Sequence, residues 1–437
     1  MITLGPRGSL RQQLIQGAFG SLAMKIGNTT LTLIMAVVLA RVLGVRDFGI
    51  YVFCLSIVQI LTVPSTLGGQ QLLVREISAY QARGDFSLLR GLLIRFRQAG
   101  LLVSVLLALA AAGIGIVVYD ESSTLIPFLL ALALVPLLTF LMLQGSAMRG
   151  FRRIILGQIY IILRPALVIV LVGMVFWHKG NNPGADGAML AQIAACMVLV
   201  ILSFFLLRRI LPDEAKSANP SYETDRWIKS VWPFVFAGAM EVLNKETSVV
   251  LLGLLRGPED VGIFRVAQRG ALLIPFGLHA VNMAIMPTLA ELAAKGEKDR
   301  LQSLISKSVL AVAAFALPVG AGLIFGGKWL IPFVFGQEFA AAYVPLVILC
   351  LGQLFNAGMG SVGVIMNMLG FERLNAVGVA MAAVVSMIAN LAFIPFLGVT
   401  GAAVATSISL ALWNILLFWW LYRKTGLVCS IRLSGRG

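Results

Sequence analysis

The chain has 437 residues, of which 59% are hydrophobic and only 12% are charged. Soluble domains carry about 25% charged residues, so this composition excludes a soluble globular protein and indicates a polytopic membrane protein. The formal net charge of +15 would suit nucleic acid, but Lys and Arg retained on the cytoplasmic side of a membrane explain it more simply. We therefore expect no nucleic-acid partner.

Twelve apolar segments are long enough to cross a bilayer, and in lipid such runs of about 20 residues must be helices. A basic front precedes the first segment, which continues to Leu43 without a convincing signal-peptide cleavage site, so we expect an uncleaved first span. The sequence predicts an all-α fold with an N-terminal six-helix lobe (1–207), a cytoplasmic linker (208–228) and a C-terminal six-helix lobe with a cytoplasmic tail (229–437). The segments are 18–43, 48–73, 98–119, 124–147, 154–177, 187–207, 229–255, 261–290, 304–326, 340–369, 374–396 and 400–422.

The 34 Lys and Arg residues divide unevenly between the two sides of the predicted membrane. With a cytoplasmic N-terminus, 24 fall in cytoplasmic segments, 5 in outer loops and 5 inside spans. Because cytoplasmic loops retain basic residues, this bias predicts that both termini are cytoplasmic. The expected location is the bacterial inner membrane.

One cytoplasmic segment, 74–98, mixes five arginines with several leucines. A helix lying among the lipid headgroups explains such a mixture, and a binding site is the alternative.

The two halves contain matching turns. The sequence GVRDFGIY (44–51) between spans 1 and 2 resembles GPEDVGIF (257–264) between spans 7 and 8, 213 residues later. A second pair, GFRR (150–153) and GFER (370–373), lies 220 residues apart in corresponding loops. Because six is an even number, both repeats would enter the membrane in the same direction, as in transporters built from parallel halves.

These turns resemble those of the polysaccharide transporter family, which belongs to the multidrug/oligosaccharidyl-lipid/polysaccharide exporter superfamily. The resemblance rests on LGVRDFGIY (43–51), LRGPEDVGIF (255–264) and LGFER (369–373). It implies two six-helix lobes around a central cavity and a flippase for undecaprenyl-diphosphate-linked oligosaccharides, working by alternating access. Expected partners are that lipid-linked oligosaccharide, membrane lipid, and the polymerase and glycosyltransferases of O-antigen or exopolysaccharide synthesis.

Charged residues inside predicted spans are the candidate substrate-binding residues, because such groups are costly in lipid and usually face a wet cavity or a partner. Arg265 and Arg269 are four residues apart on span 8 and share a helix face, with His279 about 40° from Arg265 on a straight helix. Two like charges so placed require a negative group opposite. That group is either Glu246 of span 7 or an anionic ligand.

The other candidates have simpler alternatives. Glu241 and Lys245 are also four residues apart, so they could neutralise each other rather than bind substrate. Lys25 shares a face with threonines on span 1 and could extend to the cytoplasmic surface instead. Arg164, followed by a proline, lies similarly deep in span 5.

Enzyme motifs are lacking. The segment GLIFGGK (322–328) has the spacing of a phosphate-binding loop, but Trp329 replaces the required Ser or Thr and no strand precedes it. The sequence predicts a transporter without catalytic residues, metal or cofactor. Two alternatives remain: a drug or organic-cation exporter, which would favour an acidic cavity, and a membrane-embedded glycan polymerase, which would need a large outer loop.

Overall fold

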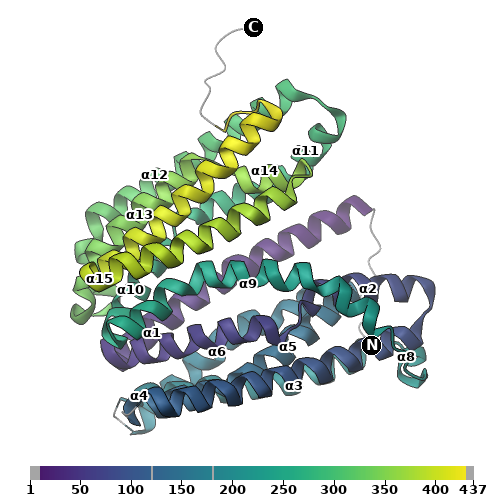
Figure 1. Cartoon of the computed structure of the whole chain (residues 1–437), viewed down its shortest axis with the longest axis horizontal. Coiled ribbons are helices and arrows are strands. Elements are labelled where there is room, and N and C mark those ends of the chain that lie inside the picture. The colour runs from purple at the N-terminus through teal and green to yellow at the C-terminus, as the bar shows by residue number, and fades with distance from the viewer. Residues whose placement is uncertain (1–9, 120–121, 180–181, 430–437) are drawn as a thin grey trace. The chain divides into compact units, whose positions relative to one another are not determined.

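The computed structural model describes residues 10–119, 122–179 and 182–429, and these form helices joined by short turns, without strands (Figure 1). The helices of the first half are α1 (Leu10–Ser65), α2 (Gly69–Arg83), α3 (Phe86–Val118), α4 (Ser122–Leu132), α5 (Leu134–Gly150), α6 (Ile154–Lys179) and α7 (Gly184–Ile210). They are followed by α8 (Asp213–Ser217), α9 (Thr224–Leu255), α10 (Pro258–Ala271), α11 (Pro275–Lys295), α12 (Lys298–Phe335), the 3-10 helix η1 (Gln337–Ala342), α13 (Tyr343–Gly358), α14 (Val362–Met368) and α15 (Glu372–Thr425).

Eight helical segments of the described residues are long and apolar enough to cross a membrane. Two of them, α1 and α15, contain a glycine with non-helical backbone angles, Gly44 and Gly398, so each consists of two spans and the total becomes ten. The helices α10 and α11, bent by 44°, form one more broken span. The 32-residue α9 carries several charges and is not among the helices apolar enough to cross a membrane, so the described residues account for eleven of the twelve expected spans. The structure confirms the predicted polytopic all-α class.

The chain forms two compact units with boundaries that differ from the expected lobes. The N-terminal unit comprises Met1–Leu39 and Val58–Gly238, and the C-terminal unit comprises Ala40–Ile57 and Ala239–Gly437. The last boundary, between Gly238 and Ala239, falls inside α9, which runs unbroken from Thr224 to Leu255. In the C-terminal unit, α13 packs between α12 and α15 (Figure 1).

The predicted linker is an ordered part of the N-terminal unit. Its short helix α8 packs on α3 through the buried Ala215, and Arg90 donates hydrogen bonds to the carbonyl oxygens of Lys216 and Ala218, at 2.6 and 2.7 Å. The backbone approaches so closely that a Cβ built on Gly91 would lie 1.8 Å from the carbonyl oxygen of Ser221. Residues 211–223 therefore follow the surface of α3 instead of forming a free connection.

The matching turns pack against each other through reciprocal contacts. Gly44 (φ 74°, ψ 179°) and Gly257 (φ 106°, ψ 177°) share an extended conformation with positive φ that favours glycine. A Cβ on Gly49 would meet the carbonyl oxygen of Pro258 at 1.8 Å, and a Cβ on Gly262 would meet that of Val45 at 2.6 Å. These contacts are reciprocal across the offset of 213 residues. The internal repeat is therefore visible in the packing.

The second sequence match does not extend to the backbone. In the later turn the positive φ lies at Gly370, at 82°, whereas in the earlier turn it lies at Arg152, at 60°, two residues after Gly150. Corresponding residues of these turns therefore have different conformations.

The segment 74–98, expected as one amphipathic helix among the headgroups, belongs to two helices. The segment divides at Gly84 between α2 and α3, and Leu89 and Leu92 are completely buried against Ile77, Tyr80 and their neighbours in one core of the N-terminal unit. The leucines face α5 and the linker because these elements cover them, so the amphipathic pattern reflects a protein core instead of a lipid surface.

The predicted orientation can be tested with single cysteines. All four native cysteines are buried, and burial raises the pKa of the Cys429 thiol to about 12, so it stays protonated and unreactive at neutral pH. In a cysteine-free background, Ser217→Cys on the exposed part of α8 should resist an impermeant thiol reagent in intact spheroplasts, whereas Ser122→Cys should react. The termini themselves, residues 1–9 and 430–437, lie outside the described residues.

The control for this experiment is permeabilisation, after which both cysteines should react. Labelling of Ser217→Cys in intact spheroplasts, with Ser122→Cys protected, would reverse the predicted orientation.

Candidate functional site

A buried ion pair joins two helices of the C-terminal unit. An Nη2 of Arg265 on α10 lies 2.8 Å from an Oε2 of Glu246 on α9, and the two side chains are only 10% and 6% exposed. The ion pair joins the two helices that the tight turn at Gly257 connects. Of the two partners expected for Arg265, the structure shows Glu246.

Ser56, at the end of the segment that α1 contributes to the C-terminal unit, completes this cluster. Its hydroxyl lies 2.7 Å from both the carboxylate of Glu246 and the guanidinium of Arg265, while the other Nη of Arg265 donates to Gln268 at 3.0 Å. A buried charge needs such additional hydrogen bonds to offset its lost hydration. Ser56 is completely buried, and it was not among the predicted site residues because an isolated serine in an apolar run gives no signal.

Arg269 lies one turn after Arg265 and is only half-buried. It also interacts electrostatically with Glu246. The predicted angular relation to His279 is wrong, because α10 ends at Ala271 and α11 begins at Pro275 with a 44° bend between them. His279, which is exposed, therefore belongs to a helix with a different direction from the helix that carries Arg265 and Arg269.

Glu241 and Lys245 form an ion pair with each other. The Nζ of Lys245 lies 2.6 Å from an Oε1 of Glu241, and both side chains are more than 60% exposed. The neutralising alternative is therefore the one that the structure shows, although the pair is accessible, unlike Glu246 and Arg265.

The two remaining candidates belong to the N-terminal unit. Lys25 on α1 is exposed, and its carbonyl oxygen accepts a hydrogen bond of 2.9 Å from the hydroxyl of Thr29. Arg164 is half-buried on α6, directly before Pro165, which lies inside the helix. The structure thus forms two groups of interacting charges. One consists of Glu246, Arg265 and Arg269, and the other of Glu241 and Lys245.

Uncharged polar residues connect the helices of the C-terminal unit, and they were not among the predicted site residues. Asn414 on α15 donates to the Oδ1 of Asn356 on α13 at 3.0 Å. Two further contacts join α9 to α15: Ser248 to Thr406 at 2.9 Å and Ser409 to Asn244 at 3.3 Å. The signal was the presence of Asn inside otherwise apolar spans, where an unsatisfied amide is costly.

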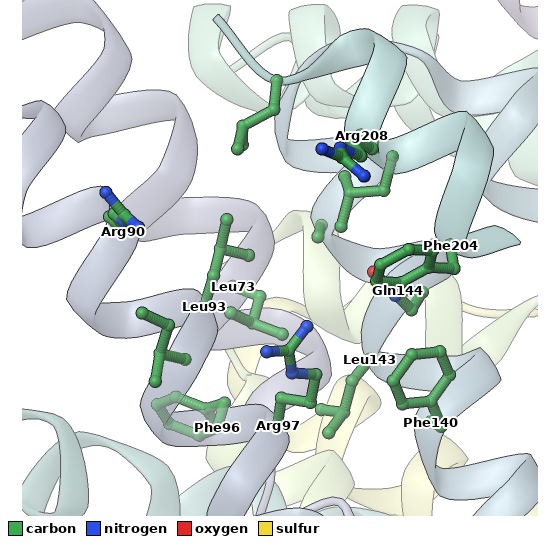
Figure 2. A pocket seen from close by; sticks show the side chains of 14 residues that line it. Leu73, Arg90, Leu93, Phe96, Arg97, Phe140, Leu143, Gln144, Phe204 and Arg208 are labelled. Carbon is green, nitrogen blue, oxygen red and sulfur yellow. The ribbon is translucent and has the colours of Figure 1, made fainter. Parts of the chain in front are cut away.

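The N-terminal unit contains a cavity of about 230 Å³ that arginine side chains border, between α2, α3, α5 and α7. Figure 2 shows three arginines around an apolar interior, with Arg97 near its middle, Arg208 on the α7 side and Arg90 at the opposite edge. No acidic residue lines it. The lining residues are Leu73, Arg90, Leu93, Ile94, Phe96, Arg97, Phe140, Leu143, Gln144, Ala147, Phe204, Leu207, Arg208 and Leu211.

Comparison with known proteins identifies the family to which this chain belongs. The sequence profile of the family described as polysaccharide biosynthesis protein matches residues 14–293, which is more than half of the chain. The chain belongs to this family. The match includes the N-terminal unit from residue 14 onward, the Glu246 and Arg265 pair, and the first of the two repeated turns with its counterpart.

Two relatives of this family member are described as probable flippases, both from Haloferax volcanii. The probable flippase AglR is 24% identical over 407 residues, which cover 90% of this chain and 81% of AglR. The probable low-salt glycan biosynthesis flippase Agl15 is 27% identical over 168 residues, and that match spans only 36% of Agl15 and 38% of this chain.

Solved structures establish the fold. The lipid II flippase MurJ in an inward closed conformation matches with a TM-score of 0.72 at 13% identity, covering 91% of this chain and 86% of MurJ. An inward-facing multidrug resistance transporter of the MATE family matches with a TM-score of 0.71 at 15% identity, covering 92% of this chain and 95% of that transporter. At such identities the likeness concerns the fold alone, and this family member is a multi-pass membrane protein of that architecture.

Proposed function

We propose that this protein is a flippase that moves an undecaprenyl-diphosphate-linked oligosaccharide across the bacterial cytoplasmic membrane for O-antigen or exopolysaccharide synthesis. The observation that carries the proposal is the family match over residues 14–293, supported by two relatives described as probable flippases. The substrate would be translocated by alternating access, with its lipid tail remaining in the bilayer. Transport of this kind requires no catalytic residue.

The charges within the spans support an anionic substrate. Apart from Arg41, Lys229 and Lys307 near the ends of their spans, five basic residues and two acidic residues lie in the predicted spans, and the acids are both engaged in ion pairs, Glu246 with Arg265 and Glu241 with Lys245. The basic residues therefore exceed the acids by three. We propose that a diphosphate is neutralised in a cationic cavity, and that Lys25 and Arg164 of the N-terminal unit and Arg269 of the C-terminal unit each supply positive charge for the substrate.

Arg269 is the residue on which the proposal is most directly testable. Arg269→Lys keeps the charge but loses the planar fork that binds phosphate in a bidentate manner, so partial export of the glycan is expected. Arg269→Ala should abolish most export, and Arg269→Glu should be the most defective. The measurement is surface glycan per amount of protein in the membrane, together with lipid-linked oligosaccharide accumulating on the cytoplasmic side.

Arg300→Ala is the matched control. Arg300 is on α12 of the same unit, its side chain is 77% exposed, and it pairs with Glu297 on the surface, so its loss should leave export unchanged. Normal export by Arg269→Glu would refute the cationic cavity, and reduced abundance of Arg269→Ala with normal export per molecule would assign Arg269 a structural role.

The MATE-like fold makes a drug or organic-cation exporter the competing function. Such a cavity would favour carboxylates, whereas the first span carries Lys25 and no acid. Energy-dependent efflux of an organic cation by the purified protein in vesicles, in the absence of glycan translocation, would select this alternative.

A further inference from the structure

We propose that the arginine-lined cavity of the N-terminal unit binds the phosphate headgroup of an anionic phospholipid of the bilayer. The site lies between α3, α5 and α7 and uses Arg97 and Arg208 as phosphate ligands (Figure 2). It contains none of the residues proposed for transport. The inference therefore stands independently of the flippase function.

The charges of this cavity favour an anion and nothing within the described chain neutralises them. Among the described residues, Arg97 and Arg208 make no hydrogen bond or ion pair, and no Asp or Glu lines the cavity. Arg90 is held by the carbonyl oxygens of Lys216 and Ala218, which are neutral groups, so its positive charge remains. Arginine side chains that line one cavity without an acidic residue are suited to phosphate oxygens.

The level of the cavity along the helices matches the level of lipid phosphates. The helix α3 has 33 residues, about 50 Å at 1.5 Å per residue, whereas crossing the hydrocarbon takes about 20 residues. Arg97 comes before Leu102, the first large apolar side chain of α3 that is exposed. On α7, Arg208 follows the exposed Phe204 and Phe205. Both arginines therefore lie where the exposed apolar surface ends, at the predicted cytoplasmic side.

The interior of the cavity distinguishes a lipid from a free phosphate ion. Below the arginines it is lined by Phe140, Leu143, Phe204 and Leu207, which offer nothing to a hydrated anion but can contact the upper part of an acyl chain. The volume of about 230 Å³ is below the roughly 300 to 1,000 Å³ that encloses a drug-sized ligand. It accommodates a headgroup, while the acyl chains extend into the bilayer.

The test is native mass spectrometry of the purified full-length protein titrated with phosphatidylglycerol or phosphatidylcholine. Wild type should retain one phosphatidylglycerol with clear preference over phosphatidylcholine. A basic residue near an anionic lipid contributes roughly fivefold to binding, so Arg97→Gln/Arg208→Gln should weaken that first site by roughly 30-fold. The preference of wild type should also fall as salt is raised.

The matched control is Arg83→Gln/Arg209→Gln, which removes the same charge from exposed arginines that do not line the cavity. An equal loss of phosphatidylglycerol binding in this control would show general attraction between basic residues and anionic lipid, and it would overturn the proposal. The absence of a preference for phosphatidylglycerol in wild type would also overturn it. Two competitors identify the occupant. Inorganic phosphate at millimolar concentration that displaces the lipid would show a free-phosphate site, and a polyprenyl diphosphate that binds there in preference to phosphatidylglycerol would show a substrate site.

Discussion

Arg265→Met is expected to deplete the protein from the membrane, because it leaves the carboxylate of Glu246 buried without its counter-ion. The two side chains are 10% and 6% exposed and 2.8 Å apart, and removing one partner of a buried ion pair costs about 3 to 5 kcal/mol. Ser56 would still donate one hydrogen bond to Glu246, which is insufficient to replace a charge. The measurement is the amount of folded protein in the membrane and its melting temperature in detergent.

The double variant Arg265→Met/Glu246→Met should recover most of this stability. Replacing both members of a buried ion pair by apolar side chains of similar volume is often neutral or stabilising, so the two single effects should be strongly non-additive. Arg300→Met, which affects an exposed pair with Glu297, should change stability by about 0 to 1 kcal/mol. Additive losses in the double variant would contradict the pairing.

The same cycle bears on function. If the pair serves only the fold, Arg265→Met/Glu246→Met should export glycan at the wild-type rate per molecule. Recovered abundance without export would show that Arg265 or Glu246 also takes part in transport.

Gly49→Ala should disrupt the contact between the two repeated turns. The added Cβ would lie 1.8 Å from the carbonyl oxygen of Pro258 and 2.6 Å from its carbonyl carbon, and backbone atoms cannot rotate away as a flexible side chain can. Overpacking of this kind costs about 1 to 3 kcal/mol or more. Because the contact is reciprocal, Gly262→Ala, whose Cβ would lie 2.6 Å from the carbonyl oxygen of Val45, should have an effect in the same direction.

The control for both variants is Gly322→Ala on α12 of the same unit. A Cβ there meets no atom within 4 Å, and alanine favours a helix more than glycine does, so the melting temperature should be unchanged or raised. A Gly49→Ala protein as stable as Gly322→Ala would show that the two turns do not pack in this way.

The spans and the fold class follow from the sequence because their physical causes are local. A run of about 20 apolar residues must be helical in lipid regardless of its neighbours, which is why even the breaks at Gly44 and Gly257 coincide with recognisable turns. The Glu241 and Lys245 pair could also be predicted, because the pair lies within one helix at a spacing of four residues.

The partners and directions of side chains that depend on packing between helices could not be predicted from the sequence. The choice between Glu246 and a ligand opposite Arg265 required the packing of α9 on α10, and Ser56 joins them from 190 residues away in the sequence. The angle predicted between His279 and Arg265 assumed one straight helix, but α10 and α11 are bent by 44° relative to each other. The unit boundary inside α9 has no local signal, because a helix can continue unchanged while its surroundings change.

The sequence by itself determined that this protein is a polytopic helical membrane protein with a repeated turn and a small set of charged residues in its spans. Apolar runs, glycine turns and charge spacing act over a few residues, so they are readable without the fold. Only the tertiary structure decided which charges are neutralised in pairs and that Arg90 and Arg97 of α3 border a cavity between helices. The physical reason is that ion pairing and burial depend on distances across helices, and residues adjacent in space there are far apart in the chain.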